Sequence, residues 1–103
     1  MQTISSTELK ERLDKNEAVN LIDVREPAEH QEFNIGGKLL PLGNILSMMV
    51  DDIEDLKGEE VICYCRSGSR SAQACLMLET FGFSNVKNLT GGMLEWKEKY
   101  ASM

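Results

Sequence analysis

The sequence predicts an α/β domain with a largely parallel sheet, because short apolar strands alternate with short amphipathic helices along the chain. An apolar, β-branched run at residues 19–24 indicates a buried strand, residues 60–65 indicate a second one, and residues 86–89 a last strand. The segments between them carry apolar residues at helical spacing. No repeat, low-complexity stretch or linker divides the chain, so we expect a single domain over residues 1–103.

Local signals fix where the elements begin and end. Ser5 and Glu8 have the spacing of a capping box at the start of a helix, and Pro27 suits the first turn of another. Gly82 follows the last apolar position of a third helix and stops it. The expected elements, in chain order, are strand 3–4, helix 6–15, strand 19–24, helix 27–33, strand 38–42, helix 46–56, strand 60–65, helix 71–81, strand 86–89 and helix 93–100.

Charge and composition exclude several classes of function. The net charge of −6 argues against nucleic acid as a partner, because phosphate binding depends on Lys and Arg. No apolar run approaches the ~20 residues of a membrane span, and the N-terminus lacks the layout of a secretory signal. The three cysteines, Cys63, Cys65 and Cys75, have no disulfide-framework spacing. We therefore expect a cytoplasmic protein, and a monomer as the default at this size.

The segment Cys65–Arg70 lies where a buried strand turns into a helix, and its residue types favour binding of an anion. Such a turn directs backbone N–H groups at one point, and the helix start adds partial positive charge. Gly68 permits a left-handed backbone, and Arg66 and Arg70 add fixed positive charge. The same surroundings lower the pKa of a thiol, so Cys65 is expected to be a nucleophilic thiolate. The alternative is a buried, inert cysteine at a strand end.

Other residues have structural interpretations beside functional ones. Asp23 is expected to have a structural role, because buried carboxylates persist when they are hydrogen-bonded, whereas Arg25 either helps to bind an anionic donor or forms a surface ion pair with Glu26 or Glu29. Cys63 and Cys75 are expected in the core, and so are Met48, Met49, Met93 and Trp96. His30 is the only histidine, on a helix expected at the surface, and the chain has no paired C-x-x-C motif, so we expect no metal site.

Three blocks of this sequence resemble single-domain rhodanese sulfurtransferases in order and spacing. They are Asp23–Pro27, Cys65–Ser71 and Asn88–Met93 with Trp96, and the resemblance spans essentially the whole chain. It implies a rhodanese-like fold of about five parallel strands with helices on both faces. The family usually has a His-Ile-Pro-Gly-Ala segment where this chain has Gly36–Pro41 without a histidine, so no role in substrate choice is carried over to that segment.

The resemblance also implies a reaction. Cys65 would accept a sulfane sulfur from thiosulfate or a persulfide and pass it, as a persulfide, to a thiol or a sulfur-acceptor protein, with no metal or organic cofactor. The residues implied to form the anion-binding loop are Arg66, Ser67, Gly68, Ser69 and Arg70.

Two other functions remain open. Cysteine phosphatases and arsenate reductases also place a Cys…Arg loop after a strand, but a tyrosine phosphatase needs five residues between them. Here four intervene between Cys65 and Arg70, and Ser71 occupies the position of the phosphatase arginine. A non-catalytic binding or sulfur-carrier module on the same fold is the other alternative, since fold alone does not determine activity.

Overall fold

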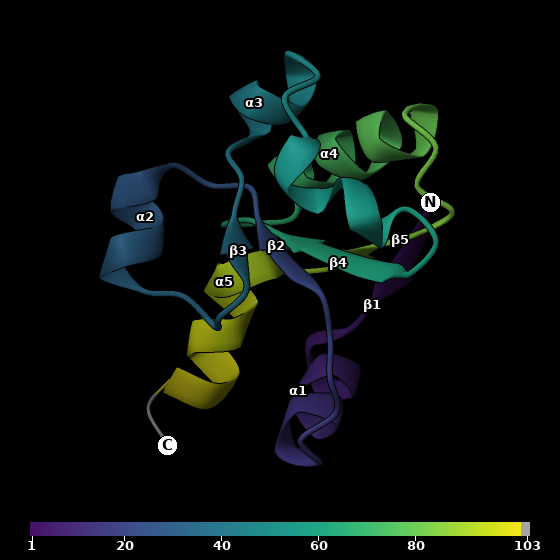
Figure 1. Cartoon of the computed structure of the whole chain (residues 1–103). Coiled ribbons are helices and arrows are strands. Elements are labelled where there is room, and N and C mark those ends of the chain that lie inside the picture. Colours follow the sequence, from purple (N-terminus) through teal and green to yellow (C-terminus); the bar gives the residue numbers. More distant parts are fainter. Residues whose placement is uncertain (102–103) are drawn as a thin grey trace.

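All five strands of the structure join one parallel sheet, in the order β1-β5-β4-β2-β3 (Figure 1). This computed structural model describes residues 1–101. The prediction of about five parallel strands is confirmed. The strands are β1 (Gln2–Ile4), β2 (Leu21–Asp23), β3 (Lys38–Leu39), β4 (Glu60–Tyr64) and β5 (Asn85–Leu89).

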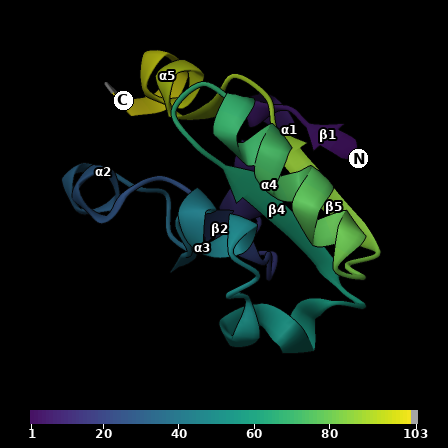
Figure 2. The same ribbon diagram turned by 90° about the horizontal axis from the view of Figure 1, so that it is seen from above.

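Helices cover both faces of this sheet, as predicted. One core cluster joins the sheet to α3, α4 and the 3-10 helix η1, and a second joins it to α1 and α5. Figure 2 shows α4 running along β4 and β5. The helical segments are α1 (Ser6–Asp14), α2 (Pro27–Glu32), α3 (Leu42–Leu46), η1 (Asp51–Leu56), α4 (Ser69–Thr80), α5 (Gly92–Trp96) and a π-helical turn, η2 (Lys97–Ala101).

The central strand β4 is buried on both faces. Its residues alternate, so that Val61, Cys63 and the following Cys65 pack in the α4 cluster, whereas Ile62 and Tyr64 pack in the α1 and α5 cluster. Cys63 and Cys75 are both buried in the first cluster, which confirms their expected core positions. This arrangement holds β4 firmly and fixes where the chain leaves it at Cys65.

Two helix starts follow the local signals read from the sequence. The Ser5 hydroxyl accepts a hydrogen bond from the Glu8 N–H at 3.1 Å and caps α1. Pro27 opens α2 as expected. Gly37 meets a different need, because a Cβ at that position would lie 2.4 Å from the Leu21 carbonyl oxygen. Gly37 therefore allows the chain to return close beside β2.

The single helix expected over residues 46–56 is wrong. The chain forms the short α3, turns at Met48, whose φ of +63° is left-handed, and resumes as the tighter η1. The turn lets Val50 and Ile53 reach the core while leaving Met48 and Met49 69% and 60% exposed. The expected core positions of Met48 and Met49 are therefore also wrong, since helical spacing does not reveal where a helix breaks.

The helices of this fold are short. The 12 residues of α4 span about 18 Å at 1.5 Å per residue, against roughly 30 Å for the apolar core of a bilayer. Within residues 1–101 no helix combines the length and apolar character that a membrane crossing requires.

Candidate active site

The loop after β4 is held against the start of α5. The N–H of Met93 donates to the Cys65 carbonyl and the N–H of Leu94 donates to the Arg66 carbonyl, both at 2.9 Å. A Cβ on Gly92 would lie 2.6 Å from each of those two carbonyl oxygens, so only glycine fits this approach. Two of the three sequence blocks, Cys65–Ser71 and Asn88–Met93, are thus directly joined.

The chain folds around the sulfur of Cys65. Its Sγ accepts hydrogen bonds from the Gly68 N–H at 3.0 Å, from the Ser71 N–H at 3.4 Å and from the Ser71 hydroxyl at 3.3 Å. Gly68 has a φ of +105°, the left-handed conformation predicted for it, and is the N-cap of α4. The turn therefore directs backbone donors at one point, and that point is the thiol.

These donors lower the pKa of Cys65. Burial raises the pKa of a thiol, and Cys65 is 0% exposed. The hydrogen bonds from the Ser71 hydroxyl and from the backbone N–H groups of Ser71, Gly68 and Ser67 outweigh burial, so the pKa of Cys65 lies below its usual value. The sequence led us to expect a contribution from the helix start and one from arginine charge; the backbone N–H groups at the helix start contribute here together with the Ser71 hydroxyl.

Ser71 and Asn88 are site residues that the list of candidates did not include. The single Ser71 hydroxyl proton is shared between Sγ and the Asn88 carboxamide oxygen, which is also within hydrogen-bonding distance, and the Asn88 amide donates to the Gly68 carbonyl at 3.1 Å. Both side chains are buried. The available signal was an asparagine beside Leu89 in an expected strand, because an amide buried in a sheet needs polar partners.

The two loop arginines differ in their surroundings. Arg70 donates two hydrogen bonds to the Glu29 carboxylate, at 2.8 and 2.9 Å, and these hold the pKa of Glu29 at about 2. Arg66 is exposed, and no ion pair within residues 1–101 includes it. Of the two arginines expected to add fixed positive charge to the loop, Arg70 is therefore paired with a carboxylate and Arg66 is not paired within the described residues.

Asp23 and Arg25 form a buried pair. Arg25 is 4% exposed and donates to both carboxylate oxygens of Asp23, at 2.9 and 2.8 Å, so the alternative of a surface ion pair with Glu26 or Glu29 is wrong. His30, expected at the surface, places Nδ1 2.8 Å from Asp23. Burial raises the pKa of Asp23, but the bonds from Arg25 and His30 lower it below its ordinary value.

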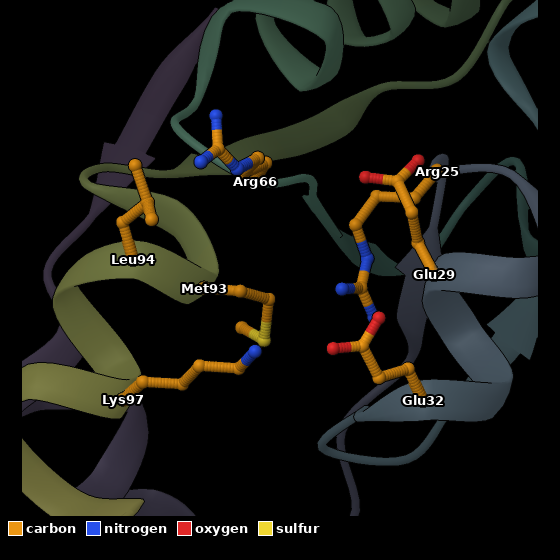
Figure 3. A pocket seen from close by; sticks show the side chains of 7 residues that line it. All are labelled: Arg25, Glu29, Glu32, Arg66, Met93, Leu94 and Lys97. Carbon is orange, nitrogen blue, oxygen red and sulfur yellow. The ribbon is translucent and has the colours of Figure 1, made fainter.

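A cleft of about 330 Å³ opens between α2 and α5 next to Arg66 (Figure 3). Figure 3 shows acidic side chains of α2 on one wall, and on the other Met93 and Leu94 of α5 with Lys97, which begins η2. In the part of the chain that the structure describes, no three His, Cys, Asp or Glu side chains gather as metal ligands. The residues that line the cleft are Arg25, Glu29, Glu32, Arg66, Met93, Leu94 and Lys97.

Comparisons with known proteins agree with this architecture. The family model described as "Rhodanese-like domain" matches residues 5–99. A protein named Sulfurtransferase from Allochromatium vinosum is 40% identical over 94 residues, covering 90% of this chain and 85% of its own. The putative sulfurtransferase YtwF from Bacillus subtilis is 38% identical over 99 residues, covering 94% and 91%.

A solved structure is similar over nearly the same span. The crystal structure of a rhodanese-like domain protein from Staphylococcus aureus superposes with a TM-score of 0.81 at 30% identity, covering 93% of this chain and 91% of that one. The family match covers most of the chain, and the curated relatives are similar along nearly their full lengths. The chain therefore belongs to the rhodanese-like domain family, among relatives that are named sulfurtransferases.

Proposed function

We propose that this protein transfers sulfane sulfur through a persulfide on Cys65. The observation that carries the proposal is the group of neutral donors around Sγ: two backbone N–H groups and the Ser71 hydroxyl within 3.4 Å. They favour the thiolate, which is the nucleophilic form of cysteine. The same groups can donate hydrogen bonds to a persulfide anion. No cation is paired with the sulfur, so none has to be displaced during sulfur transfer.

In the first step, the Cys65 thiolate attacks the outer sulfur of thiosulfate. A sulfur–sulfur bond forms at Sγ, the bond within thiosulfate breaks, and sulfite leaves with the electron pair. The product is Cys65-S–S⁻, and the total charge is unchanged. Because Cys65 is 0% exposed, the donor reaches Sγ through a small displacement of the exposed loop residues Arg66, Ser67 and Ser69.

In the second step, an acceptor thiolate attacks the terminal sulfur of the persulfide. The acceptor becomes a persulfide, and Cys65 leaves as the thiolate that the loop stabilises. The acceptor is a small thiol or a cysteine of a partner protein in the cytoplasm. The step needs no metal or organic cofactor, and the protein acts as a monomer.

Intact mass after thiosulfate treatment tests the proposal. Wild-type protein should gain the mass of one sulfur atom and should lose it on addition of cyanide. Cys65→Ser should gain none, whereas Cys75→Ser, which removes a buried cysteine outside the loop, should still gain one. Turnover of thiosulfate and cyanide by Cys65→Ser would overturn the proposal. Hydrolysis of an aryl phosphate without persulfide formation would favour a phosphatase instead.

A further inference from the structure

The cleft between α2 and α5 is larger than thiosulfate requires. Its volume of about 330 Å³ falls at the lower end of the range for pockets that hold organic ligands, roughly 300–1,000 Å³. Thiosulfate has only five heavy atoms, so it leaves most of this space unfilled. The cleft adjoins the candidate active site through Arg66, which belongs both to its lining and to the cysteine loop.

The charges that face this cleft are only partly compensated. Arg25 is neutralised by Asp23, and Glu29 is neutralised by Arg70. Arg66, Lys97 and Glu32 take part in no ion pair among the described residues 1–101. Two positive charges therefore face one negative charge, and the uncompensated charge of the cleft is positive.

The Lys97 side chain extends from one wall of the cleft toward α2 on the other (Figure 3). Its ammonium lies 4.9 Å from the centroid of the Phe33 ring, a residue that follows α2 on the opposite wall. Figure 3 shows the Lys97 side chain extending toward that wall beneath Met93. A cation over an aromatic face keeps its N–H donors available, so Lys97 can still bind a carboxylate.

The apolar part of the lining is fixed relative to Cys65. Met93 is buried, Leu94 is 48% exposed, and both are bonded through their N–H groups to the carbonyls of Cys65 and Arg66. An exposed leucine beside uncompensated cations forms an amphipathic surface. A ligand with a short carbon chain and one anionic group matches this surface.

We propose that this cleft binds the organic part of a small thiol that bears a carboxylate. Arg66 and Lys97 bind the carboxylate, Met93 and Leu94 contact the carbon chain, and the thiol sulfur is directed toward the cysteine loop. The inference rests on the proposed function, because the bound thiolate attacks the terminal sulfur of Cys65-S–S⁻. The new sulfur–sulfur bond forms on the acceptor, which leaves as R–S–S⁻ while Cys65 recovers its thiolate.

Binding is tested without any sulfur transfer. Methylthiopropionate carries the carboxylate and a sulfur that cannot react, and methylthiopropanol is its neutral counterpart. In NMR titrations the carboxylate compound should shift the amide signals of Leu94 and Lys97 saturably and should bind about two- to fivefold more tightly than the alcohol. Equal binding of the two, or signals that do not move, would overturn the inference even if Cys65 carries sulfur.

Variants identify the cations responsible. Lys97→Gln and Arg66→Gln should each reduce the preference for the carboxylate about twofold, and Glu32→Gln should increase it by a similar factor. Lys99→Gln is the matched control, because Lys99 lies in the same terminal segment and bonds to Ser6 outside the cleft. A loss of preference in Lys99→Gln equal to that in Lys97→Gln would indicate a general charge effect and would contradict the assignment.

Transfer rates complete the test. Persulfidated protein is mixed with mercaptopropionate, mercaptoethanol or cysteamine, and each rate is divided by the rate of that thiol with a free persulfide. The corrected rates should decrease from the carboxylate thiol to the neutral thiol to the ammonium thiol. In Lys97→Gln the differences between these three rates should be smaller. Persulfide that forms but shows no such order overturns the inference alone. Absence of the persulfide overturns the proposed function, and the NMR titration then decides the binding site independently.

Discussion

The two ends of β4 each carry an acidic group, and the hydrogen-bond donors around the two groups differ in kind. At the start of the strand, the Glu60 carboxylate receives hydrogen bonds from the guanidinium of Arg12 and the ammonium of Lys87. At its end, the hydrogen bonds that the Cys65 sulfur receives from residues 1–101 come only from backbone N–H groups and the Ser71 hydroxyl. Burial raises the pKa of both Glu60 and Cys65, so the kind of hydrogen-bond donor distinguishes the two ends.

The kind of donor separates the Glu60 carboxylate, which has a structural role, from the Cys65 thiol, which we propose to be reactive. Arg12 and Lys87 neutralise Glu60, and their bonds hold the pKa of Glu60 at about 2, so this carboxylate keeps its charge and its partners. Neutral donors favour the thiolate form of Cys65 without pairing it with a cation, so in the reaction we propose its electron pair stays available to a sulfur electrophile. The end of β4 that is suited to chemistry is therefore the one without a fixed counter-ion at the reacting atom.

Substituting a glycine near each end should give the largest contrast. Gly92→Ala places a Cβ 2.6 Å from the Cys65 and Arg66 carbonyl oxygens, so the loop must move. A displacement of that size at a reacting group should lower thiosulfate turnover roughly 100-fold. Gly58→Ala, just before β4, meets no atom within 4 Å and should retain turnover. Far-ultraviolet circular dichroism checks that both variants fold, and full activity in folded Gly92→Ala would contradict the tight approach.

Removal of the hydroxyl donor should have a smaller effect on the reactive end. Ser71→Ala deletes one hydrogen bond to the thiolate and raises the pKa of Cys65, which should lower its rate of alkylation by iodoacetamide at neutral pH about tenfold. Ser67→Ala is the control, because Ser67 contributes its backbone N–H and keeps it. Equal rates in the two variants would show that the Ser71 hydroxyl does not stabilise the thiolate.

The sequence predicted most of the strands and the position of the cysteine loop for a physical reason. Buried strands such as 60–65 carry a local apolar pattern, and the left-handed glycine at Gly68 follows from the turn itself. The sequence did not predict the break of the helix at Met48, because the apolar spacing of residues 46–56 continues through a turn that tertiary packing imposes.

The partners of the site residues were less predictable. Glu29 and Arg70 are 41 positions apart, and only the assembled sheet brings α2 and α4 together. Ser71 and Asn88 meet in the same way, since each belongs to a different element. Local sequence therefore located the cysteine loop and its left-handed glycine, but not which arginine forms an ion pair.

At the structural end of β4, a substitution should change stability and leave chemistry intact. Glu60→Gln removes the charge that faces Arg12 and Lys87, and the free energy of unfolding in urea should fall by about 1 kcal/mol. Thiosulfate turnover should stay within about twofold of wild type, because Glu60 lies at the opposite end of the strand from Cys65. A large loss of turnover with unchanged stability would reverse the assignment of the two ends.

The two ends should also titrate in separate pH windows. Glu60 has a pKa lowered from 4.5 to about 2, so it stabilises the fold above pH 4.5, and this contribution disappears as pH falls toward 2. The stability difference between wild type and Glu60→Gln should shrink in that interval.

The pKa of Cys65 is also lowered, from 9.0, so the folded state loses its thiol proton before the unfolded state does. The stability of wild type relative to Cys65→Ser should therefore rise with pH once the folded thiol ionises, and level off above about pH 9. Urea unfolding at a series of pH values measures both differences. If the stability difference between wild type and Cys65→Ser does not change with pH, the loop does not favour the thiolate. The two ends of β4 would then differ only in that Glu60 is charged and Cys65 is not.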